Sequence, residues 1–212
     1  MRIAELSRRT GVTSASIKHY VREGLLPAGE RVGYNQTAYG DAHESRLHLI
    51  RALLDTGGLS VAATRSVLAA IDDRALPVAH VLSASQRAVS RADATPSMDA
   101  LARVRRLVRD RGWRVCDDNP GIVQCAEVLD RFADMGRDDL GDMLERSAPP
   151  VLDIARGDLA AVAADDGDRD RMAETVVVGT ALGDALLAGL RRIAQEHVSR
   201  SAGPGADPRD PA

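Results

Sequence analysis

The side chains with the clearest chemistry in this 212-residue sequence are concentrated in residues 14–22. This stretch carries three basic and two hydroxyl side chains: Ser14, Ser16, Lys18, His19 and Arg22. Ile17 and Val21 recur at a spacing of four, which predicts a helix that buries one face and leaves the polar side chains elsewhere. A short basic helix of this kind fits the major groove of duplex DNA, where its side chains meet base edges and phosphates.

The neighbouring residues supply what such a helix needs on either side. Residues 3–9 have helical spacing, and Gly11 provides the backbone freedom of a tight turn between two helices. Thr13 is a plausible N-cap of the helix from Ser14 to Arg22, and Gly24 is its expected C-terminal stop. The order helix, turn, helix predicts a DNA-reading unit.

Residues 28–39 predict a small β-hairpin, or wing, because Gly29 and Gly33 are interleaved with strand-forming residues. Arg31 is placed there as a phosphate contact. The three tyrosines of the chain also fall in this first segment, and each combines an apolar ring with a hydroxyl that can reach a phosphate oxygen. The further predicted DNA contacts are Tyr20, Asn35 and Tyr39.

Two more helices are predicted after the wing. Asp41 is the expected cap of a helix that runs to Thr56, and Gly57-Gly58 ends it. Ser60 begins another, over Val61–Ile71. The buried stripes expected on the two helices are Leu47, Leu49, Ile50, Leu53 and Leu54, then Ala63, Val67, Leu68 and Ile71.

The N-terminal third resembles the MerR-type transcriptional regulators. The matching stretches are Met1-Arg2-Ile3-Ala4-Glu5-Leu6, Thr10-Gly11-Val12-Thr13, Ile17-Lys18-His19-Tyr20, Arg22-Glu23-Gly24-Leu25-Leu26-Pro27, Tyr39 with the helix 41–54, and Gly58-Leu59-Ser60. The resemblance implies a dimeric, sequence-specific protein bound to double-stranded promoter DNA, where such regulators twist an overlong spacer for RNA polymerase. The chain departs from the family at His19, where a second aromatic is usual, and at Asn35, where an arginine is usual.

Charge divides the chain in the same place. Residues 1–71 carry a formal net charge of +3, whereas residues 72–212 carry −6. The first part therefore attracts a polyanion that the rest repels. No secretory signal is expected, and the apolar run near residues 175–190 is interrupted by Asp184 and short for a membrane span. With two cysteines and no disulfide framework, a cytoplasmic bacterial regulator that does not contact membranes is expected.

The remainder predicts an all-helical region, so the fold class is mainly α with an N-terminal winged helix-turn-helix. The expected helices cover 77–92, 98–111, 122–135 after the start signal Asn119-Pro120, 140–164 with a bend or break at Pro149-Pro150, and 169–198. The predicted division is a DNA-binding domain at 1–73, a connecting or dimerisation segment at 74–97, a helical effector or dimerisation domain at 98–200, and a disordered tail at 201–212.

Two segments are candidates for the dimer contact. Relatives of the resembled family pair through a long antiparallel helix placed soon after the DNA-binding domain, but Pro96 splits that region here, within residues 77–111. The last helix is apolar over much of its circumference, and Gly179 and Gly183 would allow another backbone to approach. It is either a dimer contact or an internal core helix.

The C-terminal domain is expected to bind a small organic effector or simply to dimerise. Trp113 and Phe132 are its only aromatic rings, so a ligand pocket would be mostly aliphatic. Cys116 and Cys125 raise the alternative of a thiol-based metal sensor. However, Cys125 shares a helical face with Ile122, which predicts a core position, and a closed metal site would lack ligands. No metal and no cofactor are expected.

Catalytic motifs are missing from the sequence. It contains no nucleophile elbow, phosphate loop or metal-binding histidine pair, so an enzyme is not expected. Besides the regulator with an effector or dimerisation domain, one further hypothesis is an architectural DNA-binding protein whose C-terminal domain recruits another protein.

Overall fold

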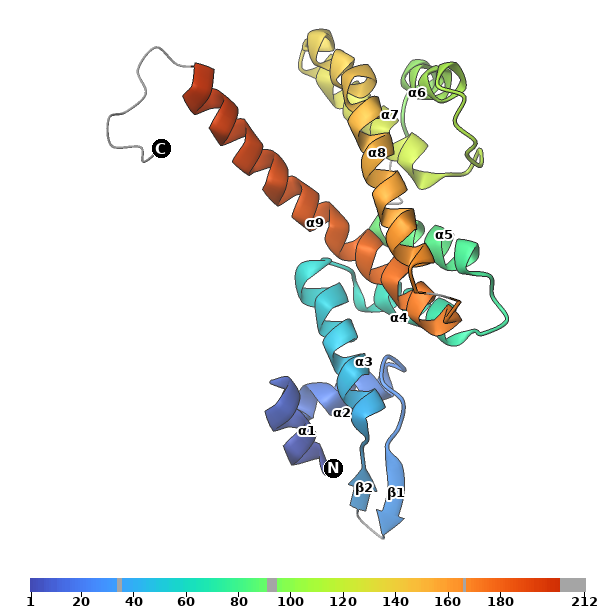
Figure 1. Ribbon diagram of the computed structural model, residues 1–212, viewed down its shortest axis with the longest axis vertical. Helices are drawn as coiled ribbons and strands as arrows, with labels where there is room; N and C mark the ends of the chain where they lie inside the picture. Colours follow the sequence, from blue (N-terminus) through green and yellow to red (C-terminus); the bar gives the residue numbers. More distant parts are fainter. Residues whose placement is uncertain (34–35, 91–94, 166, 203–212) are drawn as a thin grey trace.

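The computed structural model describes residues 1–33, 36–90, 95–165 and 167–202. A small winged unit lies at one end of the molecule, and α3 leads from it to a group of packed helices (Figure 1). From that group two long helices, α8 and α9, diverge (Figure 1). The prediction of a mainly helical chain with one N-terminal hairpin is confirmed. The expected tail falls almost wholly outside the described residues.

The first two helices form as their local signals predict. α1 (Ile3–Thr10) ends at Gly11, which adopts φ +69°. α2 (Ser14–Arg22) begins at Thr13, whose hydroxyl accepts the Ser16 N–H at 3.1 Å. Gly24 follows the helix with φ +72°. Because a left-handed backbone costs glycine nothing, each of these two positions allows a sharp change of chain direction.

The wing consists of β1 (Glu30–Gly33) and β2 (Gln36–Ala38), which pair antiparallel with Glu30 opposite Ala38. Its base is attached to the beginning of the chain by two main-chain hydrogen bonds. The Tyr39 N–H donates to the Met1 carbonyl at 2.8 Å, and the Met1 nitrogen donates to the Tyr39 carbonyl at 2.6 Å. The wing is therefore held beside α1.

One predicted cap is wrong. α3 (Asp41–Arg51) has Gly40, not Asp41, as its N-cap, and the Gly40 N–H donates to His43 Nδ1 at 3.1 Å. The helix continues as a π-helical turn, η1 (Ala52–Thr56), and ends at Gly57 as expected. α4 (Val61–Asp72) has the predicted cap, because the Ser60 hydroxyl accepts the Ala63 N–H at 3.1 Å.

The core of the winged unit continues into the C-terminal half of the chain. α5 (Val78–Val89) and α9 (Arg169–Ala202) pack against each other and against α4. One cluster of buried side chains joins all of these elements. Its members include Leu6, Ile17, Leu47, Ile50, Leu53, Val67, Leu68, Val81, Val162, Ala173, Val176, Val177 and Ala181. The start of α9 is therefore an internal core helix.

A separate, smaller core joins α6 (Met98–Asp110) and α7 (Pro120–Asp134), which begins at the predicted Asn119 cap. Its buried members are Ala100, Val104, Ile122 and Ala126. Cys125 is exposed instead, so the prediction that it fills this core is wrong. The helical face that is buried runs through Ile122 and Ala126. Partial desolvation still raises the pKa of the Cys125 thiol, which keeps it in the less reactive protonated form.

α8 (Met143–Ala163) follows a short 3₁₀ turn, η2 (Asp138–Asp142), and runs through Pro149 and Pro150 without a break. Proline at position 149 has no N–H for the carbonyl of Glu145, four residues earlier. The Arg111 guanidinium donates to that carbonyl at 3.3 Å and supplies the missing partner. Arg103 also donates to the Glu145 carboxylate, which lowers the pKa of that carboxyl.

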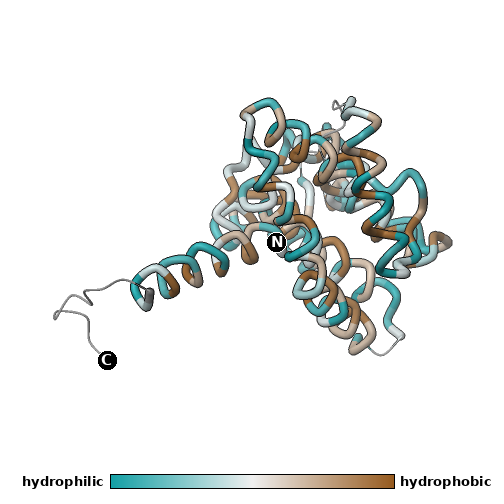
Figure 2. The backbone as a smooth tube through the Cα atoms, turned by 90° about the horizontal axis from the view of Figure 1, so that it is seen from above, coloured by the Kyte–Doolittle hydropathy of each residue, from teal (hydrophilic) through white to brown (hydrophobic). Residues whose placement is uncertain are grey.

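The second half of α9 projects away from the other helices (Figures 1 and 2). Leu186, Leu190 and Ile193 are 65%, 52% and 67% exposed. The helix continues through Asp184, so the expectation that this region is too short for a membrane span is wrong by length and composition. By length and composition alone, residues 169–201 meet the requirements of a membrane-crossing helix. Only 22% of the apolar stretch that meets these requirements is buried, although Val176 and Val177 of α9 belong to the main core.

We predict that Leu53→Ala lowers the free energy of unfolding of the whole chain by about 2–5 kcal/mol. Leu53 is fully buried in the cluster that joins the winged unit to α9, so its truncation leaves a cavity between them. Urea unfolding measures the change. The matched control, Val128→Ala on the exposed side of α7, should shift it by no more than about 0.5 kcal/mol. Equal effects of the two substitutions would contradict the shared core.

Candidate nucleic-acid interface

The polar face of α2 is open to solvent. Lys18, His19 and Arg22 are exposed, whereas Ile17 on the opposite face is fully buried against the core. Within the described part of the chain, no ion pair engages Lys18 or Arg22. Their cationic groups are therefore available to phosphates, as the periodicity of the helix predicts.

The two serines at the start of α2 are half-buried. The Ser16 hydroxyl lies 2.9 Å from the Thr13 hydroxyl and forms part of the cap. Ser14 occupies the first helical position. Both residues lie at the N-terminal end of the helix, which is the end that meets base edges when a helix of this type enters the major groove.

The predicted aromatic contacts occupy different environments. Tyr20 is half-buried, and its ring lies 6.0 Å from that of His19. Tyr39 is 9% exposed and belongs to the main core, where its ring meets His43 edge-on at 5.2 Å. Tyr39 thus has a packing role that the sequence did not indicate. Asn35 lies outside the described residues.

The wing adds a second basic surface beside α2. Arg31 is exposed on β1, and within the residues described no ion pair engages it. The sequence did not single out Arg2, whose guanidinium donates to Gln36 Oε1 on β2 at 2.8 Å. This bond joins the start of α1 to the wing, so the exposed arginine on the hairpin has a fixed place relative to the helices.

Two further arginines that the sequence did not indicate hold the C-terminal end of α2. Arg65 on α4 donates to the Glu23 carbonyl at 2.6 Å and to its carboxylate at 2.5 Å. Arg46 on α3 donates to the Leu25 carbonyl at 3.0 Å. Its other nitrogens form a two-bond pair with the Asp72 carboxylate at the end of α4. The orientation of α2 therefore depends on α3 and α4.

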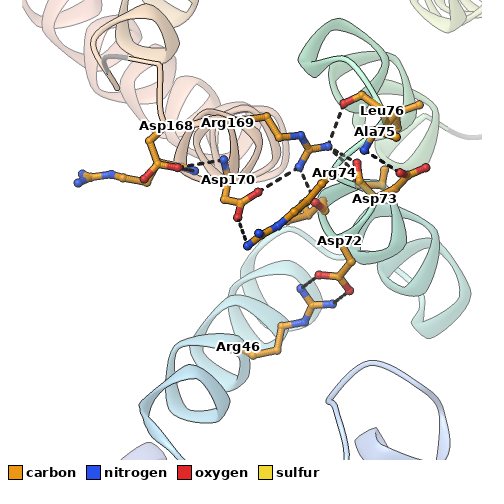
Figure 3. A network of polar contacts seen from close by, with 12 residues as sticks. Arg46, Asp72, Asp73, Arg74, Ala75, Leu76, Asp168, Arg169 and Asp170 are labelled. Atoms are coloured by element: carbon orange, nitrogen blue, oxygen red, sulfur yellow. Dashed lines mark hydrogen bonds and ion pairs between the residues drawn. The ribbon is translucent and has the colours of Figure 1, made fainter.

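Arg169, the first residue of α9, forms hydrogen bonds with the same end of α4 (Figure 3). Arg169 donates to the carbonyls of Ile71 at 2.6 Å and Leu76 at 3.0 Å. It also donates to the carbonyls of Ala70 and Asp73. A positive charge at this end is favoured by the helix dipole and by the unpaired carbonyls of the last turn. Arg74 and Asp170 form an ion pair beside it, with an N–O distance of 2.7 Å.

The residues considered for an effector or a metal are not brought together. Trp113 and Phe132 are half-buried, and Phe132 borders a small hollow of about 280 Å³ next to α6 and η2. Cys116 and Cys125 are both exposed. Across the described ranges, no three His, Cys, Asp or Glu side chains gather in a way that could hold a metal ion.

This architecture defines a winged helix-turn-helix protein with an appended helical region. Residues 1–71 match the family model described as MerR HTH family regulatory protein. The protein SCO5550 of Streptomyces coelicolor A3(2), described as a candidate transcriptional regulator, has a crystal structure that superposes with a TM-score of 0.65. The two sequences are 30% identical, over 95% of this chain and 97% of that one. The chain belongs to the MerR family of DNA-binding transcriptional regulators.

Two curated relatives match over shorter ranges. The nodulation protein NolA of Bradyrhizobium elkanii is 43% identical over 56 residues, so the match spans about a quarter of the length of that protein. The mercuric resistance operon regulatory protein of Bacillus cereus is 26% identical over 124 residues, which cover 58% of this chain and 91% of that protein. The family is not enzymatic, and the prediction that this chain is not an enzyme is confirmed by its membership.

We predict that Lys18→Ala and Arg31→Ala each weaken DNA binding to all sequences and reduce the salt dependence of the affinity by about one unit of slope. The reason is the loss of one phosphate contact in each variant. Fluorescence anisotropy with a duplex selected from a random library, at several salt concentrations, measures both quantities. Arg109→Ala on α6 is the control and should change neither. Unaltered salt slopes in both interface variants would remove these residues from the interface.

We predict that Arg169→Ala lowers the free energy of unfolding by about 1.5–3 kcal/mol, the range for hydrogen bonds made by charged groups. The substitution leaves carbonyls at the end of α4 without their donor. Urea unfolding measures the loss. Arg171→Ala provides the control on the same helix, because that side chain is 73% exposed and its charge lies 3.6 Å from Asp165. If Arg169→Ala lowers the free energy of unfolding no more than Arg171→Ala does, the hydrogen bonds from Arg169 to the end of α4 contribute little to stability.

Proposed function

We propose that the chain acts as a dimeric, sequence-specific regulator at a promoter. In this proposal α2 enters the major groove of the operator and the wing contacts the adjacent phosphates. The observation that carries it is the exposed basic face of α2, beside exposed Arg31, on a unit whose residues 1–71 match the MerR family. The proposed DNA contacts are Ser14, Ser16, Lys18, His19, Tyr20, Arg22, Arg31, Asn35 and Tyr39. Because the Tyr39 ring is buried, its proposed contact is made by the hydroxyl alone.

One curated relative supports a role in the control of transcription. The Bacillus cereus protein is described as an operon regulator, and the region matched includes 91% of its length. By analogy with the resembled family, RNA polymerase is the proposed partner on the promoter, and the cytoplasm is the proposed location. The proposed division assigns DNA binding to residues 1–73, connection to residues 74–97, and effector binding or dimerisation to residues 98–200.

The second half of α9 is the proposed dimer contact. Leu186, Leu190 and Ile193 follow a spacing of four and then three residues, which is typical of a coiled-coil seam, and more than half of each side chain is exposed. The alternative contact in residues 77–111 has less support. α5 is only 12 residues long, and its Val81 and Ser85 are already buried inside the chain.

Selection of duplexes from a random library by the full-length chain, followed by footprinting, tests the proposed DNA binding. Two protected half-sites related by two-fold symmetry are expected, because a symmetric dimer imposes its symmetry on the operator. A single asymmetric footprint would contradict the dimer, and enrichment of no sequence would contradict specific recognition.

We predict that Ile193→Glu converts the dimer into a monomer, because it places a carboxylate in an apolar seam. Light scattering after size-exclusion chromatography measures the mass. Arg192→Glu is the matched control on the neighbouring position and should leave the dimer intact. A dimer that survives Ile193→Glu together with Leu190→Glu would place the contact elsewhere.

A further inference from the structure

A groove lies between α8 and α9 where the two helices diverge, and it is completed by α5 and the beginning of α7. Its volume is about 490 Å³, which falls within the range of small-molecule sites of about 300–1,000 Å³. Leu82, Val162 and Val176 lie on its inner side, and the latter two are buried in the main core. The groove therefore opens from the core of the molecule to the solvent.

The walls of this groove are aliphatic. Ile154 and Leu159 of α8 lie across from Leu186 and Leu187 of α9, and these four side chains are 36–65% exposed. None of the described lining residues has an aromatic ring. Such walls favour a flexible aliphatic ligand over a planar one, since stacking partners for a flat ring are lacking.

Two glycines on α9 leave the groove open. Gly179 and Gly183 both line it, and a Cβ atom added at either position would meet no other atom within 4 Å. Side chains at these positions would therefore enter the groove itself. This gives a direct way of filling the site without disturbing the packing of the core.

The ionisable residues that line the groove are all acidic. Asp158 of α8 and Asp184 of α9 are the ionisable residues among the described lining, which includes no arginine, lysine or histidine. Polar groups that can accept or donate hydrogen bonds accompany them, among them the amides of Gln86 and Gln124. The complement of two carboxylates beside aliphatic walls is a cation with an apolar body.

The position of the groove, rather than its size, separates a small-ligand site from most of the proposed dimer seam. Of the three exposed residues proposed for that seam, Leu186 lines the groove, whereas Leu190 and Ile193 lie further along α9 and do not.

We propose that this groove is the effector site of the protein and that its ligand is a small aliphatic ammonium compound. The binding of the ligand does not depend on the proposed regulatory function, but its role as an effector does. One wall of the site is the helix whose first residue, Arg169, holds the end of α4. Occupancy of the groove thereby acts on the element that supports α2.

Three probes with the same carbon chain separate charge from apolar contact: n-octylammonium, 1-octanol and octanoate. Isothermal titration of the full-length chain is expected to give the order ammonium, alcohol, carboxylate, from tightest to weakest. Asp158→Asn and Asp184→Asn should each weaken octylammonium binding by about two- to fivefold, the effect of losing one exposed ion pair, and leave octanol unchanged. Asp110→Asn, on the exposed face of α6, is the charge-matched control and should alter neither.

Gly183→Leu is the decisive variant, because its side chain would occupy the groove. It is expected to weaken octylammonium binding tenfold or more, while Gly189→Leu, six residues further along the same helix, should bind as the wild type does. Equal binding by the two leucine variants, or a preference for octanoate, would overturn the proposal. Conversion of the dimer to a monomer by Gly183→Leu, without probe binding to the wild type, would assign the groove to a second copy of the chain.

DNA affinity measured in parallel keeps the two proposals separate. The unliganded wild type binds its selected duplex if the proposed function is right, whatever the probes do. Octylammonium is expected to change that affinity in the wild type and not in Gly183→Leu. If octylammonium binds the protein but leaves its DNA affinity unchanged, the effector role is overturned, while the proposed ligand site and the proposed DNA binding both stand.

Discussion

The structure depends most on the contact between one guanidinium and the end of α4. Arg169, at the start of α9, donates to four main-chain carbonyls of residues 70–76. The Ala70 and Ile71 carbonyls belong to the last turn of α4, where a helix leaves carbonyls without partners, and their donor comes from almost 100 residues away in sequence. Together with the buried Val176 and Val177, this contact makes the last helix of the chain part of the core that supports the first ones.

The position of α2 depends on this arrangement. Its C-terminal end is fixed by Arg65 from α4 and by Arg46 from α3, and Arg46 is itself paired with Asp72 at the end of α4. A polar path therefore leads from α9 through the end of α4 to the residues that follow α2. Because each step is a hydrogen bond between rigid elements, a displacement of α9 has a physical route to the DNA-binding face.

The sequence predicted those features whose cause is local. The caps at Thr13, Ser60 and Asn119 follow from a side chain and the backbone within three residues of it. Features with distant causes were missed. The hydrogen bonds from Arg46, Arg65 and Arg169 to main-chain carbonyls were missed because a main-chain acceptor leaves no mark in a sequence. The same holds for the bond from Arg111, at the end of α6, to the Glu145 carbonyl that Pro149 leaves without its helical partner. Periodicity identified a buried face on α7 but not its centre, so Cys125 was assigned to the wrong side.

Lys18 is the sole lysine among 212 residues, and it is exposed on α2. An enzyme that acylates lysine side chains therefore has one target side chain in this molecule. Acylation would abolish a single positive charge in the middle of the candidate DNA-binding face and leave the arginine hydrogen bonds to main-chain carbonyls untouched. The chain thus has one side-chain amine, at the place where a fluorescent reporter or a charge-neutralising group would be most informative.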